Sequence, residues 1–473
     1  MQGELPREVA TRPVLERMVE AVRHRGPDDG GTYLDARAGL GHRRLSIVDL
    51  SSAGHQPLRS ADGNLWVTFN GEIFNYVELR RSLESRGHVF RTHTDTETIV
   101  QAFAADGPRC VESFNGDFAY ALWDRRGQRL VLARDRMGVR PLYYTIADGV
   151  LVFASEVKAL LEYPGVRAEL DPFALAQCFT FWFPLAPRTP YKGIFELPPG
   201  HQLIAERGAL TVAPYWRLAF PEADAHRGDG RTEAEVAEAL EALLDDATRI
   251  RLRADVPVGA YLSGGFDSSA TTALARRNTS GRLRTFSVGF ERAEYDETPY
   301  QEAVVRALGT EHSSLLCRTT DIGERFPDVV RHTERPMLRT APAPLYMLAR
   351  LVRENGFKVV VTGEGADEVF GGYDIFKEAA VRRFWSRRPS SAWRPALLRR
   401  LYPYLGGMQA QSTAYLAAFF RNGLDRAHDP LFSHLPRFLL AQRAMRFFSA
   451  ELRQALKGYD PMEELRDTLP RAF

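Results

Sequence analysis

The pattern of hydrophobic and polar positions divides the chain into two regions. Up to about Trp216 the apolar residues form short runs separated by turns rich in Gly and Asp, namely LWVTFNGEIFN, FAYALWD, RLVLARD, PLYYTI and VLVFASE. Short apolar runs bounded by turn residues are typical of β-strands. We therefore expect a layered antiparallel-sheet domain, an α+β fold, over residues 1–215.

The second region alternates helical and strand patterns. The segment TEAEVAEALEALLDDATRIRLR has helical spacing, with Thr232 as N-cap and Glu235 completing a capping box. The runs VPVGAYL, RTFSVGF and FKVVVTG follow, each continued by a loop and a helical pattern. This order predicts a parallel α/β domain over residues 232–473, with a helical, arginine-rich extension from Asp374. The polar segment 216–231, and within it Phe220–Asp229, predicts a linker.

Composition narrows the classes of partner. The 473 residues exceed what one core usually supports, which favours two domains. The 62 basic and 60 acidic residues leave a net charge of +2, so no global nucleic-acid footprint exists. The tail segment RRFWSRRPSSAWRPALLRRLYPYL interleaves arginines with aromatic residues. An RNA-binding face would explain it, but amphipathic helices with a solvated basic face explain it as well, and we expect no nucleic-acid partner.

No apolar run is long enough to span a bilayer, and the first residues lack a signal-peptide core, so we expect a cytoplasmic protein without a membrane partner. The three cysteines, Cys110, Cys178 and Cys317, are far apart and lack a Cys-x-x-Cys pattern. We expect them to be buried as small apolar residues.

Two segments carry candidate chemistry. LSGGFDSS, residues 262–269, follows an apolar strand and precedes a helical pattern, and glycines before a helix N-terminus form a place to hold phosphate. Asp267 within it suits a Mg²⁺ ion that bridges the carboxylate to a polyphosphate. TGEGADE follows FKVVV and gathers Glu364, Asp367 and Glu368, a cluster of negative charge that Mg²⁺ and an attacking amine would use.

The chain resembles the glutamine-hydrolysing asparagine synthetase family through nine motifs in family order, RHRGPDD, GHRRLSIVDLS, NGEIFNY, DTE, ARDRMGVRPLYY, FASEVKAL, LSGGFDSS, TFSVGF and TGEGADEVFGGY. The resemblance implies an αββα sandwich of the N-terminal-nucleophile glutaminase type, followed by an ATP-pyrophosphatase domain of the adenine nucleotide alpha hydrolase-like fold. It also implies asparagine synthesis from aspartate through β-aspartyl-AMP, with ammonia from glutamine. The implied cofactors are ATP and Mg²⁺, and a homodimer is possible.

The same resemblance implies site residues. Glu364 would serve the adenylation and amide-forming steps, while Asn70 and Gly71 would form an oxyanion hole. Asp267 and Asp367 would hold Mg²⁺. The implied glutamine-binding residues are Arg44, Leu45, Ser46, Ile47, Val48, Asn70, Gly71, Glu72 and Asp95, with Arg44 on the α-carboxylate and Glu72 and Asp95 on the α-ammonium. The implied ATP-binding residues are Leu262, Ser263, Gly264, Gly265, Asp267, Ser268, Ser269, Val288, Thr362 and Gly363.

Two departures from the family pattern change the expectation. Family members begin Met-Cys-Gly, with the cysteine as nucleophile, whereas position 2 is Gln2 here. Cys110, which we expect in a helix before FNGDFAYALWD, cannot replace the N-terminal cysteine, because it is internal and has no free α-amine. The chain also stops at LRDTLPRAF, before the family's closing helical region, so we expect a sequence truncated at both ends.

Two alternatives stay open. One is a ring-closing ligase similar to β-lactam synthetases or lasso-peptide cyclases, which can lack the cysteine. In β-lactam synthetases a tyrosine occupies the position that corresponds to Glu364. The glutamate at this position therefore favours intermolecular amide formation by this chain. The other is a catalytically inert binding or regulatory homologue. The sequence does not identify the acyl substrate, because the pocket side chains come from loops without a recognisable motif.

Overall fold

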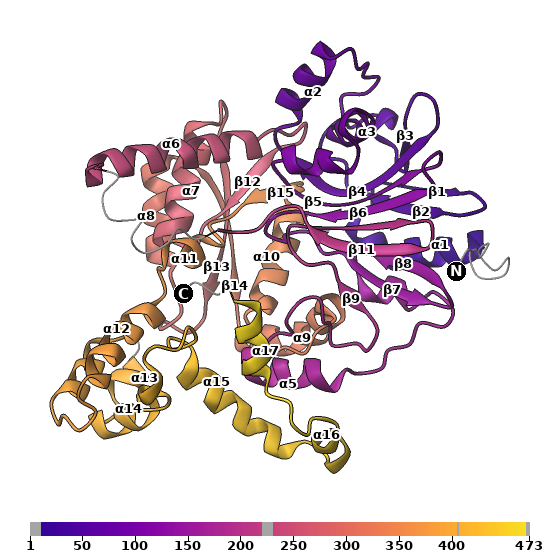
Figure 1. Cartoon of the computed structure of the whole chain (residues 1–473). Coiled ribbons are helices and arrows are strands. Elements are labelled where there is room, and N and C mark those ends of the chain that lie inside the picture. The colour runs from indigo at the N-terminus through magenta and orange to yellow at the C-terminus, as the bar shows by residue number, and fades with distance from the viewer. Residues whose placement is uncertain (1–10, 220–229, 404–405, 470–473) are drawn as a thin grey trace. The chain divides into compact units, whose positions relative to one another are not determined.

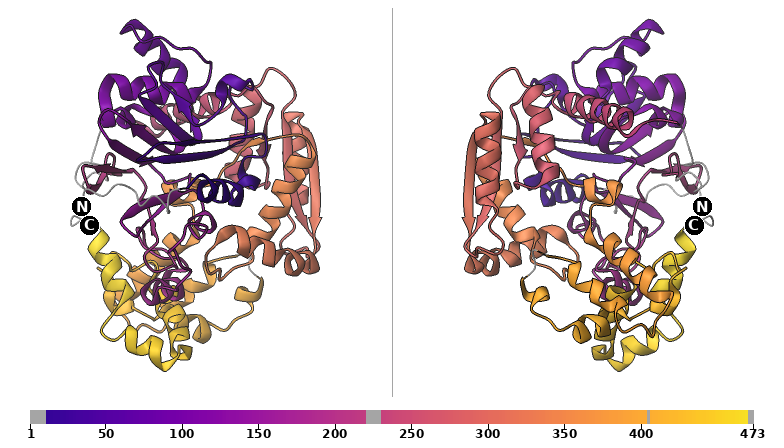
Figure 2. Two further views of the ribbon diagram at one scale, coloured as in Figure 1. Left: turned by 90° about the vertical axis from the view of Figure 1, so that its right-hand side faces the viewer. Right: turned by 90° about the vertical axis from the view of Figure 1, so that its left-hand side faces the viewer.

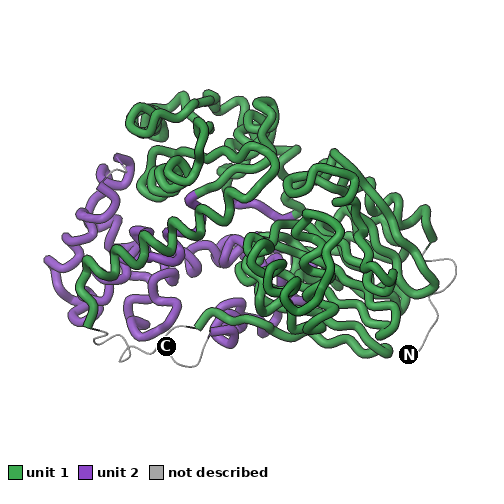
Figure 3. The backbone as a smooth tube through the Cα atoms, turned by 90° about the horizontal axis from the view of Figure 1, so that it is seen from above, with its two compact units in different colours: residues 1–169, 186–334, 339–362 green, residues 170–185, 335–338, 363–473 purple. Residues whose placement is uncertain are grey.

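The computed structural model describes residues 11–219, 230–403 and 406–469, which form two compact units. The first unit comprises residues 1–169, 186–334 and 339–362, and the second comprises residues 170–185, 335–338 and 363–473 (Figure 3). The core of the predicted linker, residues 220–229, lies outside the described residues. The domain boundaries at 215 and 232 therefore stay predictions.

The N-terminal part of the first unit is built from antiparallel strands (Figure 1). Their bounds are β1 Asp29–Leu34, β2 Gly39–Arg44, β3 Leu58–Arg59, β4 Leu65–Ile73, β5 Gly116–Asp124, β6 Arg129–Arg134, β7 Tyr143–Ala147, β8 Val150–Ala154, β9 Phe195–Glu196, β10 His201–Glu206 and β11 Ala209–Pro214. They form a six-stranded sheet in the order β11-β10-β6-β5-β4-β3, a three-stranded sheet β8-β7-β9 and a pair β1-β2. All these pairings are antiparallel, which confirms the predicted class.

The alternation of side chains along β5 explains the layers. Phe118, Tyr120 and Leu122 join the core against helices α2 and α3, whereas Ala119, Ala121 and Trp123 join a second core with residues of β2, β7 and β10. Successive side chains of a strand point to opposite faces, so the large sheet is covered on both sides. The helices here are α1 Arg12–Ala21, α2 Tyr76–Ser85, α3 Asp95–Asp106 and α4 Val157–Leu160, with 3₁₀ segments η1 Arg23–Arg25, η2 Ser52–Gly54 and η3 Gly107–Ser113.

The outermost layer is helical. Val14 and Met18 of α1 and Val157 and Leu160 of α4 pack with residues of β7 and β8, completing the predicted α–β–β–α order. Cys110 lies in the 3₁₀ segment η3 and not in the α-helix that the sequence predicted. Gly107, with φ of +62°, ends helix α3, and the proline that follows lacks the backbone N–H that would continue it, so the Cys110 segment forms a separate short turn.

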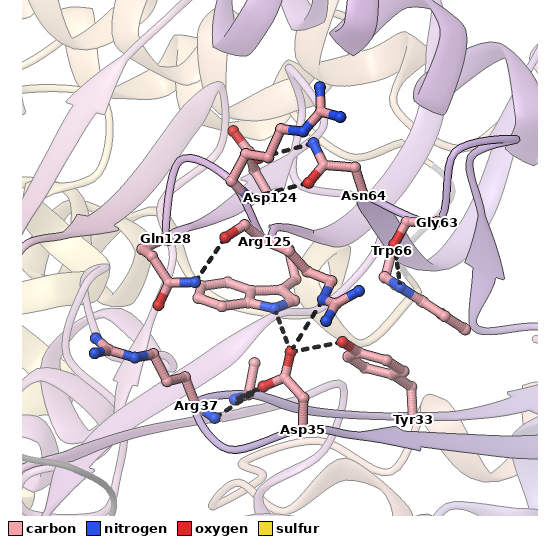
Figure 4. Close-up of polar contacts among 12 residues, drawn as sticks. Tyr33, Asp35, Arg37, Gly63, Asn64, Trp66, Asp124, Arg125 and Gln128 are labelled. Carbon is pink, nitrogen blue, oxygen red and sulfur yellow. Dashed lines mark hydrogen bonds and ion pairs between the residues drawn. The ribbon is translucent and has the colours of Figure 1, made fainter.

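The turn between β1 and β2 is tied to the large sheet by one carboxylate. Asp35 accepts hydrogen bonds from the Tyr33 hydroxyl at 2.6 Å and from the indole N–H of Trp123 on β5 at 3.0 Å (Figure 4). Arg125 lies 3.7 Å away as an ion-pair partner. This contact fixes the hairpin end of β2, the strand that leads into the predicted glutamine-binding segment.

The C-terminal part of the first unit contains the predicted parallel sheet. Its strands are β12 Val258–Tyr261, β13 Arg284–Phe290, β14 Glu311–Cys317 and β15 Val359–Val361, in the order β14-β13-β12-β15, and every pairing is parallel. Helix α6, Glu233–Arg251, begins with the predicted capping box of Thr232 and Glu235. The other helices are α7 Phe266–Arg277, α8 Thr298–Leu308, α9 Thr319–Thr333 and α10 Pro342–Glu354.

Two cores cover the two faces of this sheet. Ala275 of α7 packs with Ala260 and Val361, whereas Leu348 and Val352 of α10 pack with Phe286. The helices therefore flank the sheet as in other parallel α/β units, and Figure 2 gives two further views of them. The edge strand β14 was not predicted, because its sequence EHSSLLC has few apolar residues and most of them are partly exposed.

The second unit is helical. It contains α5 Pro172–Phe181, α11 Ala366–Phe370, α12 Asp374–Ser386, α13 Gly406–Gln409, α14 Thr413–Phe420, α15 Leu435–Gln442, α16 Ala450–Ala455 and α17 Pro461–Thr468, with 3₁₀ segments η5 Arg394–Arg400, η6 Leu424–Arg426 and η7 Arg443–Phe447. This confirms the predicted helical extension. None of the helices within the described residues is long and apolar enough to cross a membrane.

Part of the arginine-rich tail is used inside the second unit. Arg382 is fully buried and its guanidinium donates hydrogen bonds to the carbonyl oxygens of Phe420, Phe432 and Asn422. Arg394 donates to the Phe384 carbonyl and stacks on that residue's ring. Both arginines are held by internal contacts, so the basic and aromatic pattern serves internal structure at these positions.

Candidate active sites

A cavity of about 450 Å³ lies in the N-terminal part of the first unit. Residues of α1, β2, β4, β8 and the start of α3 line it. The lining includes most of the predicted glutamine-binding residues, which are Arg44, Leu45, Ile47, Val48, Asn70, Gly71, Glu72 and Asp95. Ser46 is outside the lining, and its backbone N–H donates to Asp28 at 2.8 Å. Folding therefore brings together polar groups from three separate motifs.

Asn70 and Gly71 lie side by side on β4. The side-chain Nδ2 of Asn70 is buried and has no hydrogen-bond partner among the described residues. A buried donor without a partner costs free energy. Its presence in the cavity therefore indicates a group that hydrogen-bonds to a ligand. Gly71 has φ of +140°, and an added Cβ would lie 2.0 Å from the Asp117 carbonyl oxygen, so only glycine fits there.

Glu72 and Asp95 are two buried carboxyl groups of the cavity, 6% and 5% exposed. Burial, reinforced by the negative charge of Asp95, raises the pKa of Glu72 to about 7. Burial also raises the pKa of Asp95 to about 6, although the Ile73 N–H donates to it at 2.9 Å. Carboxyl groups with raised pKa values in a cavity are suited to pairing with a cationic ligand group.

Arg44, at the end of β2, is hydrogen-bonded to the loop that follows it. Its guanidinium donates to the carbonyl oxygens of Ser51 at 2.9 Å, Val48 at 3.3 Å and Asp49. These bonds fold residues 45–51 around the arginine. Arg44 therefore shapes the loop in addition to the carboxylate-binding role predicted for it.

Three lining residues received no role from the sequence. His42 is on the same strand face as Arg44, and burial followed by the charge of Arg44 lowers its pKa to about 3. Gln56 accepts a hydrogen bond from the Phe69 N–H at 2.7 Å. Arg140 lines the cavity, and its Nε is buried without a partner among the described residues. Among these three residues, the sequence pointed only to His42, because a residue two positions from Arg44 on a strand lies on the same face.

All three cysteines of the chain are buried, as predicted, and none lines the cavity. Burial raises the pKa of Cys110 to about 12 and that of Cys178 to about 11. Thiols with raised pKa values carry little thiolate, which is the nucleophilic form. No cysteine nucleophile therefore faces the cavity.

The predicted phosphate-binding segment forms the corner between β12 and α7. Gly265 is the N-cap of α7, and Gly264 has φ of +88°. The Ser263 and Ser268 hydroxyls lie 2.8 Å apart, and the Gly265 N–H donates to the Ser263 hydroxyl at 3.2 Å. Asp267 is in the first turn of α7. A glycine corner at a helix N-terminus and at the carboxyl end of a parallel strand is a geometry that binds phosphate.

Val288 on β13 is linked to this corner by a residue that the sequence did not single out. The Gln301 side chain is 2% exposed, and its Nε2 donates to the Val288 carbonyl at 3.0 Å and to the Ser263 carbonyl at 3.4 Å. Leu262 is buried beneath the corner, and Thr362 directly follows β15, the other neighbour of β12. The predicted nucleotide residues of the first unit thus lie at the carboxyl ends of adjacent strands.

Gly363, Glu364 and Asp367 belong to the second unit, so their distances from Asp267 stay predictions. Within that unit the acidic cluster is a real electrostatic feature. The hydrogen bond to Glu368, and then the charges of Asp367 and Glu364, contribute to raising the pKa of Tyr373 to about 12. No group of three or more His, Cys, Asp or Glu side chains suited to a metal occurs in the part of the chain that the structure describes.

Comparisons with known proteins agree with this architecture. The family described as "Glutamine amidotransferase domain" matches residues 2–216, and the family described as "Asparagine synthase" matches residues 239–467. The fold and the two family matches thus define a glutamine amidotransferase domain joined to an ATP-dependent ligase domain.

Three similar proteins narrow the class. Asparagine synthetase (glutamine-hydrolyzing) 1 of Bacillus subtilis is 33% identical over 461 residues, covering 97% of this chain and 69% of that protein. Asparagine synthetase (glutamine-hydrolyzing) 3 of the same organism is 31% identical, covering 90% and 72%. Amidase chyE of Penicillium rubens is 35% identical, covering 81% and 57%. The chain belongs to the glutamine-hydrolysing asparagine synthetase family.

Proposed function

We propose that this chain forms asparagine from aspartate, ATP and an ammonia donor. ATP transfers its AMP group to the aspartate β-carboxylate and releases pyrophosphate, and ammonia then attacks the acyl-adenylate and releases AMP. The observation that carries this proposal is the Ser–Gly corner at the carboxyl end of β12, with Asp267 in the first turn of α7. The family membership supplies the reaction type.

In this proposal the corner residues bind the polyphosphate. The backbone N–H groups at the start of α7 and the hydroxyls of Ser263, Ser268 and Ser269 would surround it, and the positive end of the helix dipole would favour its charge. Gln301 is a positioning residue, because its two hydrogen bonds keep the Ser263 and Val288 backbones in register.

Mg²⁺ is part of this proposal. In ATP sites this ion takes one or two protein carboxylates together with phosphate oxygens, and Asp267 and Asp367, each in the first turn of a helix, would supply such carboxylates. When bound, Mg²⁺ would neutralise phosphate charge and so would favour the departure of pyrophosphate. Glu364 would position or deprotonate the attacking amine.

The cavity is proposed as the glutamine site. The carboxylates of Glu72 and Asp95 would pair with the α-ammonium, and Arg44 with the α-carboxylate. Asn70 Nδ2, buried without a partner in the described structure, would donate to the amide oxygen and to the oxyanion that forms from it.

The test is a product assay with the full chain, aspartate, ammonium and Mg-ATP. We expect asparagine, AMP and pyrophosphate in equal amounts. Aspartate-independent conversion of ATP to ADP would contradict the proposal, because it would show phosphoryl and not adenylyl transfer. An inert binding protein would release no pyrophosphate at all.

The second candidate is the same adenylation chemistry on a different acyl group. It is supported by the 35% identity to a protein named as an amidase, which is as high as the identity to the asparagine synthetases. Pyrophosphate exchange that is absent with aspartate but present with another carboxylic acid would favour it. Net formation of AMP and a cyclic product when no amine is added would favour a ring-closing ligase.

A further inference from the structure

Residues 45–51, here called the glutamine loop, contact the parallel sheet as well as the cavity. Leu45, Ile47 and Val48 line the cavity, and the backbone of the same loop contacts two residues that precede strands β12 and β15. All of these residues belong to the first compact unit. The loop is therefore held from outside the antiparallel domain that it serves.

Asp255 makes the first of these contacts. Its backbone N–H donates to the Ile47 carbonyl at 3.0 Å, and its Oδ2 accepts from the Asp49 N–H at 2.7 Å. Together the two bonds form a small ring that fixes the centre of the loop. Asp255 stands three residues before β12, the strand that ends at the proposed phosphate corner.

Lys358 makes the second contact. Its Nζ donates to Asp28 Oδ2 at 2.5 Å and to the Ser46 carbonyl at 3.2 Å, while the Ser46 N–H donates to the same Asp28 oxygen at 2.8 Å. Burial alone would raise the pKa of Asp28, but the hydrogen bonds from Lys358 and Ser46 lower it below its ordinary value. Lys358 directly precedes β15.

The loop needs such support because its backbone is strained. Asp49 has φ of +54°, in the left-handed region that non-glycine residues rarely adopt. A conformation of this kind persists only where surrounding contacts hold it. The contacts at Asp49 are the Asp255 carboxylate, the His93 N–H, the Ser51 hydroxyl and the Arg44 guanidinium. Asp255 is the only one of these four that lies outside the antiparallel domain.

The two contacts arise from one edge of the sheet. Strands β12 and β15 are parallel neighbours, with Val258 opposite Val359, so Asp255 and Lys358 both precede the amino ends of these strands. The carboxyl ends carry the proposed nucleotide residues. A four-residue strand spans only about 13 Å, so a short rigid element separates the glutamine loop from the phosphate corner.

We propose that Asp255 and Lys358 are positioning residues. Through them the parallel sheet holds the glutamine loop and so sets the affinity of the cavity for glutamine. This inference rests on the proposed function, because it requires the cavity to bind glutamine. Neither residue touches the cavity, so each acts through the backbone of residues 46–49.

The same interface supplies a matched control. Arg253, two residues before Asp255, pairs with Glu78 at 2.6 Å and donates to the Phe74 carbonyl at 2.7 Å, without contacting the glutamine loop. Arg253→Met therefore removes a contact between the same two parts of the first unit and leaves the loop bonds in place. General loosening of the interface would affect this variant as much as the Asp255 variants.

The experiment measures glutamine and Mg-ATP binding to the full chain by calorimetry. We expect Asp255→Ala and Lys358→Met each to weaken glutamine binding about tenfold, because each change removes one charge-assisted hydrogen bond to the glutamine loop. Asp255→Asn keeps an oxygen that accepts from Asp49, so it should stay within about threefold of the parent chain. Arg253→Met should stay within about twofold, and ATP affinity should stay within about twofold in every variant.

The outcomes separate the two proposals. A parent chain that binds no glutamine would overturn the proposed glutamine site, and this inference with it. A parent chain that binds glutamine, together with an Asp255→Ala variant that binds it equally well, would overturn the inference alone. An equal loss in Arg253→Met, or a parallel loss of ATP affinity, would also overturn it, because either result would show general damage and not loop positioning.

Discussion

The two proposed sites of the first unit hold their ligands by different means. In the cavity the polar groups are side chains taken out of water, and Glu72 and Asp95 are 6% and 5% exposed. At the phosphate corner the chain is open, Phe266 is 88% exposed, and backbone N–H groups at a helix start are the main donors. The first site depends on the ionisation of buried groups. The second depends on backbone geometry and one carboxylate, so the two sites should respond differently to substitution and pH.

The largest contrast that we expect is between binding and hydrolysis in the cavity. The polypeptide of this sequence should bind glutamine but release no glutamate above background, because no cysteine lines the cavity to attack the amide. Amide synthesis by it should therefore depend on free ammonium. A coupled glutamate assay measures this directly. Glutamate release at a rate matching the synthesis of asparagine would show that another nucleophile acts there.

At the phosphate corner, Asp267→Ala should lower aspartate-dependent pyrophosphate exchange by about 10³-fold. The change removes a proposed metal ligand and leaves only backbone and hydroxyl donors. Asp245→Ala is the matched control, because it removes a partly exposed carboxylate of α6 that pairs with Arg277 of α7. Exchange that survives in Asp267→Ala at the parent rate would remove this aspartate from the site.

A smaller effect, about 10²-fold on amide formation, is expected for Glu364→Gln, with ATP affinity nearly unchanged. The amide keeps the size of the side chain but cannot accept a proton from the attacking amine. The comparison is between ATP binding by calorimetry and asparagine formation by chromatography. Glu368→Gln, in the same acidic cluster, serves as the control and should retain amide formation. Equal product rates in the parent chain and Glu364→Gln would show that Glu364 has no catalytic role in amide formation.

The smallest effect concerns pH and the buried carboxyl groups. Their raised pKa values, about 7 for Glu72 and about 6 for Asp95, mean that both are protonated in mild acid. A protonated carboxyl group cannot pair with the α-ammonium of glutamine, so affinity is present above these pKa values and is lost below them. Glutamine binding should weaken about tenfold between about pH 8 and about pH 5. Glu72→Gln should flatten this profile. A flat profile in the parent chain would show that the α-ammonium group of glutamine does not pair with these carboxyl groups.

Several elements could be read from the sequence because their signals are local. The capping box of Thr232 and Glu235 starts α6 as predicted, and the apolar runs around β4, β5 and β12 are strands. The edge strand β14 could not be read, because a polar strand is specified by the partner β13 and not by its own pattern. The 3₁₀ form of the Cys110 segment was missed for a different reason, since a helical sequence pattern does not distinguish α-helical from 3₁₀ turns.

The site residues show the same division. Asn70, Gly71 and Glu72 adjoin one another in the sequence, and so do Ser263 to Ser269, so motif reading could find both groups. Gln301 could not be found, because its role depends on two carbonyls that belong to β13 and the β12 corner. Asp255 and Lys358 gave no signal either, since each is an ordinary charged residue until the chain folds.

The sequence by itself determined the two fold classes, the family, and the residue types of both proposed sites, because these depend on short-range periodicity and on contiguous motifs. Only the tertiary structure decided that Glu72 and Asp95 share one cavity and carry raised pKa values, and that Arg44 also donates hydrogen bonds to loop carbonyls. It alone joined Ile47 to Asp255 and Ser46 to Lys358, across 208 and 312 positions of the chain. Burial and long-range hydrogen bonds are properties of packed segments, and no local pattern encodes which segments will meet.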